Sequence, residues 1–131
     1  ETCAAHSVQG LIVSNTTISR PDGLLSPFAQ ERGGLSGAPL RTLSTRVLAQ
    51  AHRLARGRLV LIGVGGVASG RDAFDKIRAG ASLVQLYTAF AYDGPALIPR
   101  LKAELAAELR RAGFARIEDA VGTAADHFAK G

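Results

Sequence analysis

The chain has 131 residues, of which 47% are hydrophobic and 21% charged, and its formal net charge is +5. This length suits one domain and this composition allows a buried core, which excludes a disordered tail. The single cysteine, Cys3, excludes a disulfide scaffold and a cysteine-based zinc site. The basic residues are spread along the chain and do not alternate with aromatic residues, so we predict no nucleic-acid partner despite the positive charge.

The chain contains no methionine, even at position 1, and residues 1–6 have the composition of the middle of a helix. Natural chains begin with methionine unless they are processed. We therefore expect residues 1–131 to be the C-terminal, incomplete part of a single domain that belongs to a longer protein.

The first half of the chain is expected to form a strand, a long loop and a helix. Residues 10–15 are an apolar run with polar residues at its end, which is typical of a parallel strand buried on both faces. The polar stretch 16–43 is longer than ordinary connections, and loops of that length are usually functional. The next helix is expected to begin at a cap, Ser44 or Thr45, and to end near Gly57.

A second strand and a second helix follow. The strand is predicted at 59–63 and leads into a glycine-rich turn at 64–67. Ser69 is expected to cap a helix over 71–78, with Asp72 as the acidic half of a capping box.

A third strand is predicted at 82–86, a long helix between Pro95 and Gly113, and a short helical turn at 117–121. The apolar residues expected to form the buried stripe of the long helix are Leu97, Ile98, Leu101, Leu105 and Leu109. Alternating strands and helices indicate the α/β class, with a parallel sheet and right-handed crossovers. Two architectures fit this order: part of an eight-stranded βα barrel, or part of an open doubly wound sheet.

In both architectures ligands bind beyond the carboxyl ends of the parallel strands. The glycines at 63–66 precede a helix, where free backbone amides can hold a phosphate; alternatively, they allow a tight turn. Asn15 can donate to and accept from a planar polar ligand, or it can cap the next turn. His6, His52 and His127 lack the spacing of metal ligands, so we predict surface histidines and no metal site.

Four segments together resemble dihydroorotate dehydrogenase of class 2, the quinone-linked and membrane-associated type. These segments are residues 14–20, 33–40, 62–67 and 78–88, and the likeness runs from about residue 10 to residue 121. The resemblance implies a TIM (βα)8 barrel, of which this chain is the last three βα units. It also implies oxidation of dihydroorotate to orotate in de novo pyrimidine biosynthesis, with FMN as cofactor and a quinone as electron acceptor.

The resemblance further assigns roles to individual residues. The main-chain amides of Gly37, Gly66, Tyr87 and Thr88 are expected to hold FMN, mainly at its phosphate. Ser14 stands where the family usually has threonine, so its hydroxyl is expected to keep the contact with FMN.

Asn15 and Thr16 match the positions that bind the orotate ring. No catalytic residue is assigned in this chain, because the family's serine base corresponds to a position upstream of Glu1, and Cys3 does not match the cysteine base of class 1. The quinone is expected to enter through a segment upstream of Glu1, and the parent protein to lie peripherally on the cytoplasmic side of the inner membrane. We expect the isolated chain to be inactive, and Gly66→Val in the parent protein to weaken FMN binding more than folding.

Two other functions remain open at this stage. One is a stand-alone phosphate- or nucleotide-binding half-barrel without catalysis. The other is a different FMN or sugar-phosphate barrel enzyme, although segment 14–20 argues against it because a phosphate site alone does not require that segment.

Overall fold

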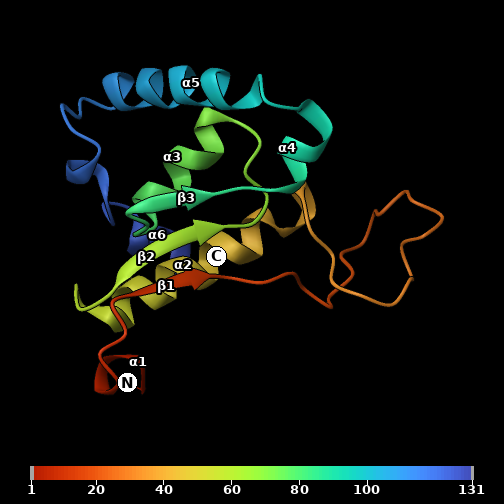
Figure 1. Cartoon of the computed structure of the whole chain (residues 1–131), viewed down its shortest axis with the longest axis horizontal. Coiled ribbons are helices and arrows are strands. Elements are labelled where there is room, and N and C mark those ends of the chain that lie inside the picture. The colour runs from red at the N-terminus through yellow and green to blue at the C-terminus, as the bar shows by residue number, and fades with distance from the viewer. Residues whose placement is uncertain (1, 131) are drawn as a thin grey trace.

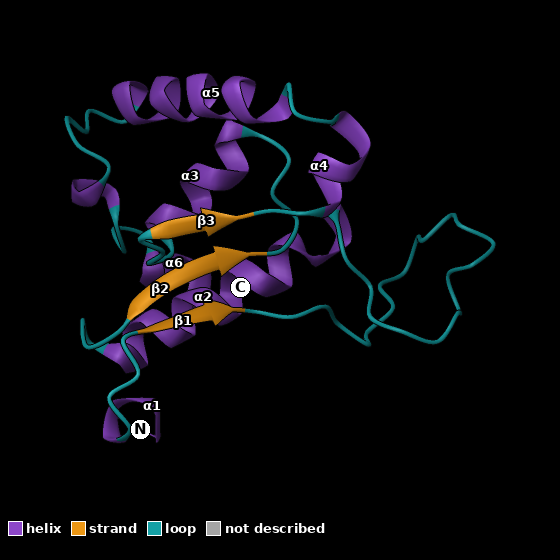
Figure 2. Cartoon of the chain, in the orientation of Figure 1, coloured by secondary structure: helices purple, strands orange, loops and turns teal. Residues whose placement is uncertain are grey.

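The computed structural model describes residues 2–130, which form a three-stranded parallel sheet with helices on one face (Figures 1 and 2). The strands are β1 (Gly10–Val13), β2 (Val60–Val64) and β3 (Leu83–Gln85), in that order across the sheet. The helical elements are α1 (Thr2–Ala5), η1 (Ala38–Leu40), α2 (Arg41–Ala55), α3 (Gly70–Arg78), α4 (Thr88–Asp93), α5 (Leu97–Arg111), η2 (Glu118–Ala120) and α6 (Ala125–Lys130). The predicted α/β class and parallel sheet are confirmed.

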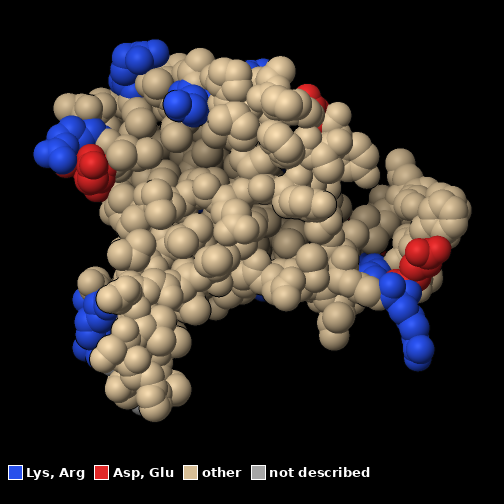
Figure 3. Space-filling view, in the orientation of Figure 1, with Lys and Arg blue, Asp and Glu red and all other residues tan. Residues whose placement is uncertain are grey.

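One face of the sheet is uncovered within the described residues. Ile12 pairs in register with Ile62, and Ile62 with Leu83, so these side chains point to the same side. Ile12 is 54% exposed and Leu83 57% exposed. The expectation that the strands are buried on both faces is therefore wrong for this part of the chain, because the helices pack on the opposite face. Figure 3 shows few charged side chains on the face toward the viewer, and those present lie at its edges.

The opposite face of the sheet packs against α2 and α3 and forms the main core. Leu48 from α2 and Phe74 and Ile77 from α3 are almost fully buried there, together with Leu61 from β2. Gly63 allows this close packing, because a Cβ atom at that position would lie 2.9 Å from Leu48 Cδ2. The core thus fixes β2 against both helices and sets the position of the turn that follows β2.

Helix α2 begins earlier than predicted. Its first residue is Arg41, directly after the 3-10 turn η1, so Ser44 and Thr45 lie inside the helix rather than at its cap. The Thr45 hydroxyl donates to the carbonyl of Arg41 at 2.8 Å, and the Ser44 hydroxyl lies within hydrogen-bond distance of two carbonyls, those of Arg41 at 3.1 Å and Gly65 at 3.0 Å. The predicted cap is wrong because η1 leads directly into Arg41, and hydroxyls inside a helix can bond to carbonyls one turn back. The predicted end near Gly57 is confirmed, since Arg56 and Gly57 both have left-handed torsions.

Helix α3 begins as its sequence predicts. The Ser69 hydroxyl accepts a hydrogen bond from the amide of Asp72, and the Asp72 carboxylate accepts one from the amide of Ser69, both at 3.1 Å. This reciprocal pair is a capping box. It fixes the start of α3 immediately after the glycine-rich turn.

The C-terminal third agrees in part with the predictions. The long helix α5 lies between Pro95 and Gly113, and η2 forms the predicted turn near 117–121. Ile98, however, is 39% exposed and does not belong to the buried stripe. Helices α4 and α6 were not predicted, because six residues are too few to show helical periodicity.

His52 departs from the predicted surface position. A Cβ atom at Gly80 or Gly122 would lie within about 2.4 Å of its imidazole ring, so the ring is held between these two glycines. His6 and His127 are exposed, as predicted. The partial burial of His52 thus results from packing between α2 and the two glycine turns.

Candidate functional site

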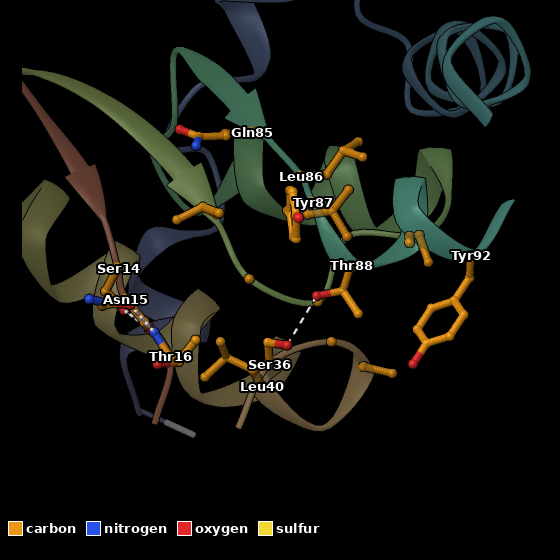
Figure 4. A pocket seen from close by; sticks show the side chains of 18 of the residues that line it. Ser14, Asn15, Thr16, Ser36, Leu40, Gln85, Leu86, Tyr87, Thr88 and Tyr92 are labelled. Carbon is orange, nitrogen blue, oxygen red and sulfur yellow. Dashed lines mark hydrogen bonds between the residues drawn. The ribbon is translucent and has the colours of Figure 1, made fainter. Parts of the chain in front are cut away.

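A cavity of about 700 Å³ lies at the carboxyl ends of the three strands. It is formed by the segments that follow β1, β2 and β3 and by the residues around the start of η1 (Figure 4). The site residues predicted from the sequence all line this cavity, and they are Ser14, Asn15, Thr16, Gly37, Gly66, Tyr87 and Thr88. The structure therefore brings together residues up to 74 positions apart in the sequence (14 to 88), while their individual roles stay predictions.

Asn15 and Thr16 stand at the β1 end of the cavity. The Asn15 side-chain oxygen accepts a hydrogen bond from the Thr16 amide at 2.8 Å, which supports the turn-capping interpretation for that oxygen. Among the described residues, the side-chain nitrogen of Asn15 donates no hydrogen bond. Asn15 can therefore stabilise its own turn and still donate to a polar ligand in the cavity.

The opposite end of the cavity is rich in hydrogen-bond donors. The Thr88 hydroxyl donates to the Ser36 hydroxyl at 3.1 Å and joins the start of α4 to the loop before η1. The first amides of a helix have no partner within the helix, so the amides around Thr88 are available to a ligand. Backbone amides and hydroxyls together suit an oxyanion such as a phosphate.

The glycine-rich turn between β2 and α3 forms the floor between these two ends. Gly65 and Gly66 both have positive φ, at 101° and 72°. A Cβ atom at Gly66 would lie 2.6 Å from Arg41 Cβ and 2.7 Å from its backbone nitrogen. Glycine is thus required here by torsion and by close packing against α2, in addition to any role in ligand binding.

Four polar or aromatic residues of the cavity were missed from the sequence: Ser36, Gln85, Tyr92 and Asp93. Gln85 could have been found, because it is a lone polar residue in an apolar strand and faces the cavity end of β3. Tyr92 and Asp93 belong to α4, which periodicity did not reveal.

An ion pair between Arg41 and Asp72 stabilises the glycine-rich turn. Arg41 donates to the Asp72 carboxylate at 2.5 Å, and Asp72 is also the acidic residue of the capping box of α3. Burial alone raises the pKa of Asp72, but the hydrogen bonds from Arg41, Ser69 and the Ala68 amide outweigh it and lower the pKa below its usual value. Asp72 therefore stays ionised and links the starts of α2 and α3.

A buried lysine lies beneath the same turn. Lys76 of α3 has no solvent exposure, and its ammonium donates to the hydroxyls of Ser44 and Thr45 at 2.5 and 2.9 Å. Burial lowers the pKa of Lys76 to about 8, although the negative charge of Asp72 partly opposes this shift. Lys76 could not be selected from the sequence, because a buried lysine and an exposed one have the same appearance in a helical segment.

The loop between β1 and η1 is organised around one arginine. The Arg20 guanidinium donates to the carbonyls of Ala29, Glu31 and Gly33, each at 2.8 Å. The two ends of the loop are joined by paired hydrogen bonds between Thr17 and Leu35. These contacts replace regular secondary structure in the loop that extends to the right in Figure 1. They also place the β1 end of the cavity next to the residues before η1.

We expect Arg20→Gln to loosen this loop. The planar guanidinium reaches several carbonyls at once, whereas glutamine can reach only one or two of them. Losing about 1–2 kcal/mol of local stability increases the open population about tenfold, so cleavage at Glu31 by a glutamate-specific protease should accelerate by a similar factor. Arg110→Gln removes an arginine charge in the same way, at an exposed position on α5, so it serves as the control and should leave the cleavage rate unchanged. Equal cleavage rates in all three proteins would contradict this role of Arg20.

Comparison with known proteins identifies the family. Residues 1–109 match the family model described as dihydroorotate dehydrogenase. The chain belongs to the dihydroorotate dehydrogenase family. This assignment agrees with the resemblance carried by the four segments.

Two relatives within the dihydroorotate dehydrogenase family both carry the name of the quinone-linked enzyme. The dihydroorotate dehydrogenase (quinone) of Azorhizobium caulinodans is 63% identical over 88% of this chain and 32% of its own length. The mitochondrial dihydroorotate dehydrogenase (quinone) of Oryza sativa is 64% identical over 90% of this chain and 25% of its own length. The chain thus spans about a quarter to a third of the curated relatives it matches.

A solved structure of the family resolves the architecture. The ligand-free DHODH of Eimeria tenella superimposes with a TM-score of 0.89 and 42% identity, over 95% of this chain and 34% of that one. Dihydroorotate dehydrogenases are TIM barrels, so the parallel three-stranded sheet corresponds to the last βα units of a barrel and not to an open doubly wound sheet. None of the helices in residues 2–130 combines the length and the hydrophobicity that a membrane-spanning helix requires.

Proposed function

We propose that the full-length protein oxidises dihydroorotate to orotate with FMN as cofactor and a quinone as electron acceptor, in de novo pyrimidine biosynthesis. Family membership supports this reaction, as do several relatives named dihydroorotate dehydrogenase (quinone). The observation that carries the proposal is that one cavity combines a donor-rich end around Thr88 with Asn15 and Thr16 at its other end.

The donor-rich end fits the phosphate of FMN. The amides of Gly37, Gly66, Tyr87 and Thr88 would hold the phosphate, with the hydroxyl of Ser14 contacting the cofactor nearer to β1. When bound, FMN supplies the acceptor for the hydride that leaves dihydroorotate. The chain's own residues bind and orient the two molecules, and the apolar residues of the cavity exclude water.

The β1 end fits the substrate ring. The Asn15 side-chain nitrogen can donate to a ring carbonyl while its oxygen stays bound to the Thr16 amide. Thr16 is exposed next to it, and its hydroxyl, which lies against Gly34, offers a second polar contact. Two adjacent polar groups can fix the orientation of a planar ring, which hydride transfer requires.

We assign no catalytic base to the described residues. The cavity lining contains one carboxylate, Asp93, which is bound by Arg100 at 2.7 Å. We propose that the base, the access route of the quinone and a peripheral attachment to the cytoplasmic side of the inner membrane belong to other parts of the full-length protein.

Turnover by the purified full-length protein tests this proposal. The protein should reduce a short-chain quinone analogue only when dihydroorotate is present, and orotate should accumulate in equal amount. A protein that binds FMN but shows no dihydroorotate-dependent reduction of the analogue would favour the alternative, a phosphate-binding barrel without this activity.

A further inference from the structure

We propose that Lys76 is a positioning residue for the cofactor phosphate: its buried ammonium, acting through the Ser44 hydroxyl, orients the peptide between Gly65 and Gly66 so that the Gly66 amide faces the cavity. This inference rests on the proposed function, since it takes FMN as the ligand of the cavity.

The hydrogen bonds around Lys76 have a defined direction. An ammonium group can only donate, so the hydroxyls of Ser44 and Thr45 both accept from it. Each hydroxyl must then give its own proton to another acceptor. Thr45 has the Arg41 carbonyl at 2.8 Å, and Ser44 has the Gly65 carbonyl at 3.0 Å as well as the Arg41 carbonyl at 3.1 Å.

The Gly65 carbonyl requires a hydrogen-bond donor. Among the described residues, the Ser44 hydroxyl is the donor that the structure gives to this carbonyl. This hydrogen bond is partly buried, and carbonyls shielded from water are rarely left without a donor. The Arg41 carbonyl already receives the Thr45 proton. The ammonium of Lys76 therefore favours the arrangement in which Ser44 donates to Gly65.

The geometry of the peptide bond between Gly65 and Gly66 sets the direction of the Gly66 amide. In a trans peptide the C=O and the following N–H point in opposite directions. Because the Gly65 carbonyl points inward to Ser44, the Gly66 amide points outward, and both glycines line the cavity. That amide is one of the groups that would hold the FMN phosphate, so the buried charge controls a ligand-binding donor that it does not touch.

The direction in which the Ser44 hydroxyl donates depends on pH, because it depends on the protonation of Lys76. A neutral amine has a lone pair and can accept from Ser44, which would release the Gly65 carbonyl. The charged groups that act on Lys76 are Asp72 and Asp75 of α3, which favour the ammonium, and Arg41 of α2, which disfavours it; β2 contributes only the uncharged Gly63. With a pKa of about 8, the ammonium is lost between roughly pH 7 and 9, above the range in which a phosphate monoester itself titrates.

The test compares FMN with riboflavin, which lacks the phosphate, on the apo form of the full-length protein. Dissociation constants come from the quenching of flavin fluorescence. Lys76→Met keeps an unbranched side chain of similar length without the charge, and we expect it to weaken FMN binding about tenfold while riboflavin binding stays unchanged. Ser44→Ala, which breaks the link to Gly65 but retains the charge, should give the same selective loss.

Lys102→Met is the matched control, because Lys102 is exposed on α5 and its loss changes the net charge equally. It should leave both dissociation constants unchanged. In the wild-type protein FMN affinity should fall from pH 7 to 9.5, and this fall should be absent in Lys76→Met. A role in stability alone predicts no such difference between the two flavins.

Several outcomes would overturn the inference. An FMN-to-riboflavin affinity ratio that is equal in the wild type and in Lys76→Met would remove Lys76 from phosphate positioning. Weakened FMN binding in Lys76→Met but not in Ser44→Ala would contradict the path through Ser44. If Lys76→Met does not fold, an unchanged FMN-to-riboflavin affinity ratio in Ser44→Ala would overturn the inference by itself. A wild-type protein that binds neither flavin would instead contradict the proposed function, and the inference with it.

Discussion

Asn15→Ala in the full-length protein is expected to lower kcat/KM for dihydroorotate by about ten- to a hundredfold while FMN remains bound. Asn15 lines the cavity and its side-chain nitrogen donates to no described residue, so this nitrogen is free to pair with the substrate ring. Leaving a buried polar group of the substrate unpaired costs about 1–3 kcal/mol, and each 1.36 kcal/mol corresponds to a factor of ten in rate.

A second substitution separates this role from turn formation. Asn15→Asp keeps an oxygen that can accept from the Thr16 amide but has no nitrogen to donate. If Asn15 binds substrate, Asn15→Asp should lose kcat/KM as strongly as Asn15→Ala and keep the wild-type melting temperature. If Asn15 only caps its turn, Asn15→Asp should behave like the wild type in both measurements, and Asn15→Ala should lose stability with nearly normal kinetics.

Gly66→Val should destabilise the fold by about 3 kcal/mol or more and abolish FMN binding with it. The branched side chain would need an unfavourable positive φ, and its Cβ would overlap with Arg41, whose backbone is fixed at the start of α2. This differs from the sequence-based expectation that the substitution acts mainly on FMN. The turn packs against α2 as closely as it borders the cavity, so folding and binding cannot be separated at Gly66.

Gly23→Val provides the matched control for this prediction. Gly23 has a similar φ of +87°, but no atom lies within 4 Å of a Cβ built there. It should therefore show only the effect of the torsion, about 1–2 kcal/mol or less in a loop. Urea unfolding of both variants gives the comparison, and equal losses of stability would contradict the close packing between Gly66 and α2.

Features with a local sequence signature could be predicted. The capping box of Ser69 and Asp72 lies within four residues, and the strands are short apolar runs, so both were found. The cavity residues could be placed because the carboxyl ends of parallel strands meet at one edge of the sheet. Family resemblance then added the roles of residues such as Asn15, which no spacing rule supplies.

Features that depend on tertiary contacts could not be predicted. Ser44 has the properties of a cap, yet Arg41 starts the helix because η1 leads directly into it. Lys76 is buried only because α2 supplies two hydroxyls above it, and Arg20 binds carbonyls nine to thirteen residues away. Such partners are brought together by folding, and a single sequence carries no periodic signal for them.

The flavin spectrum of the purified full-length protein tests the central claim most directly. If the cavity holds FMN beside the substrate site formed by Asn15 and Thr16, the protein should be yellow and show the visible absorption band of an oxidised flavin. Under anaerobic conditions, one equivalent of dihydroorotate should bleach that band, and a quinone analogue should restore it. A protein that stays colourless after incubation with FMN, or whose flavin band is unchanged by excess dihydroorotate, would contradict the assignment of this cavity.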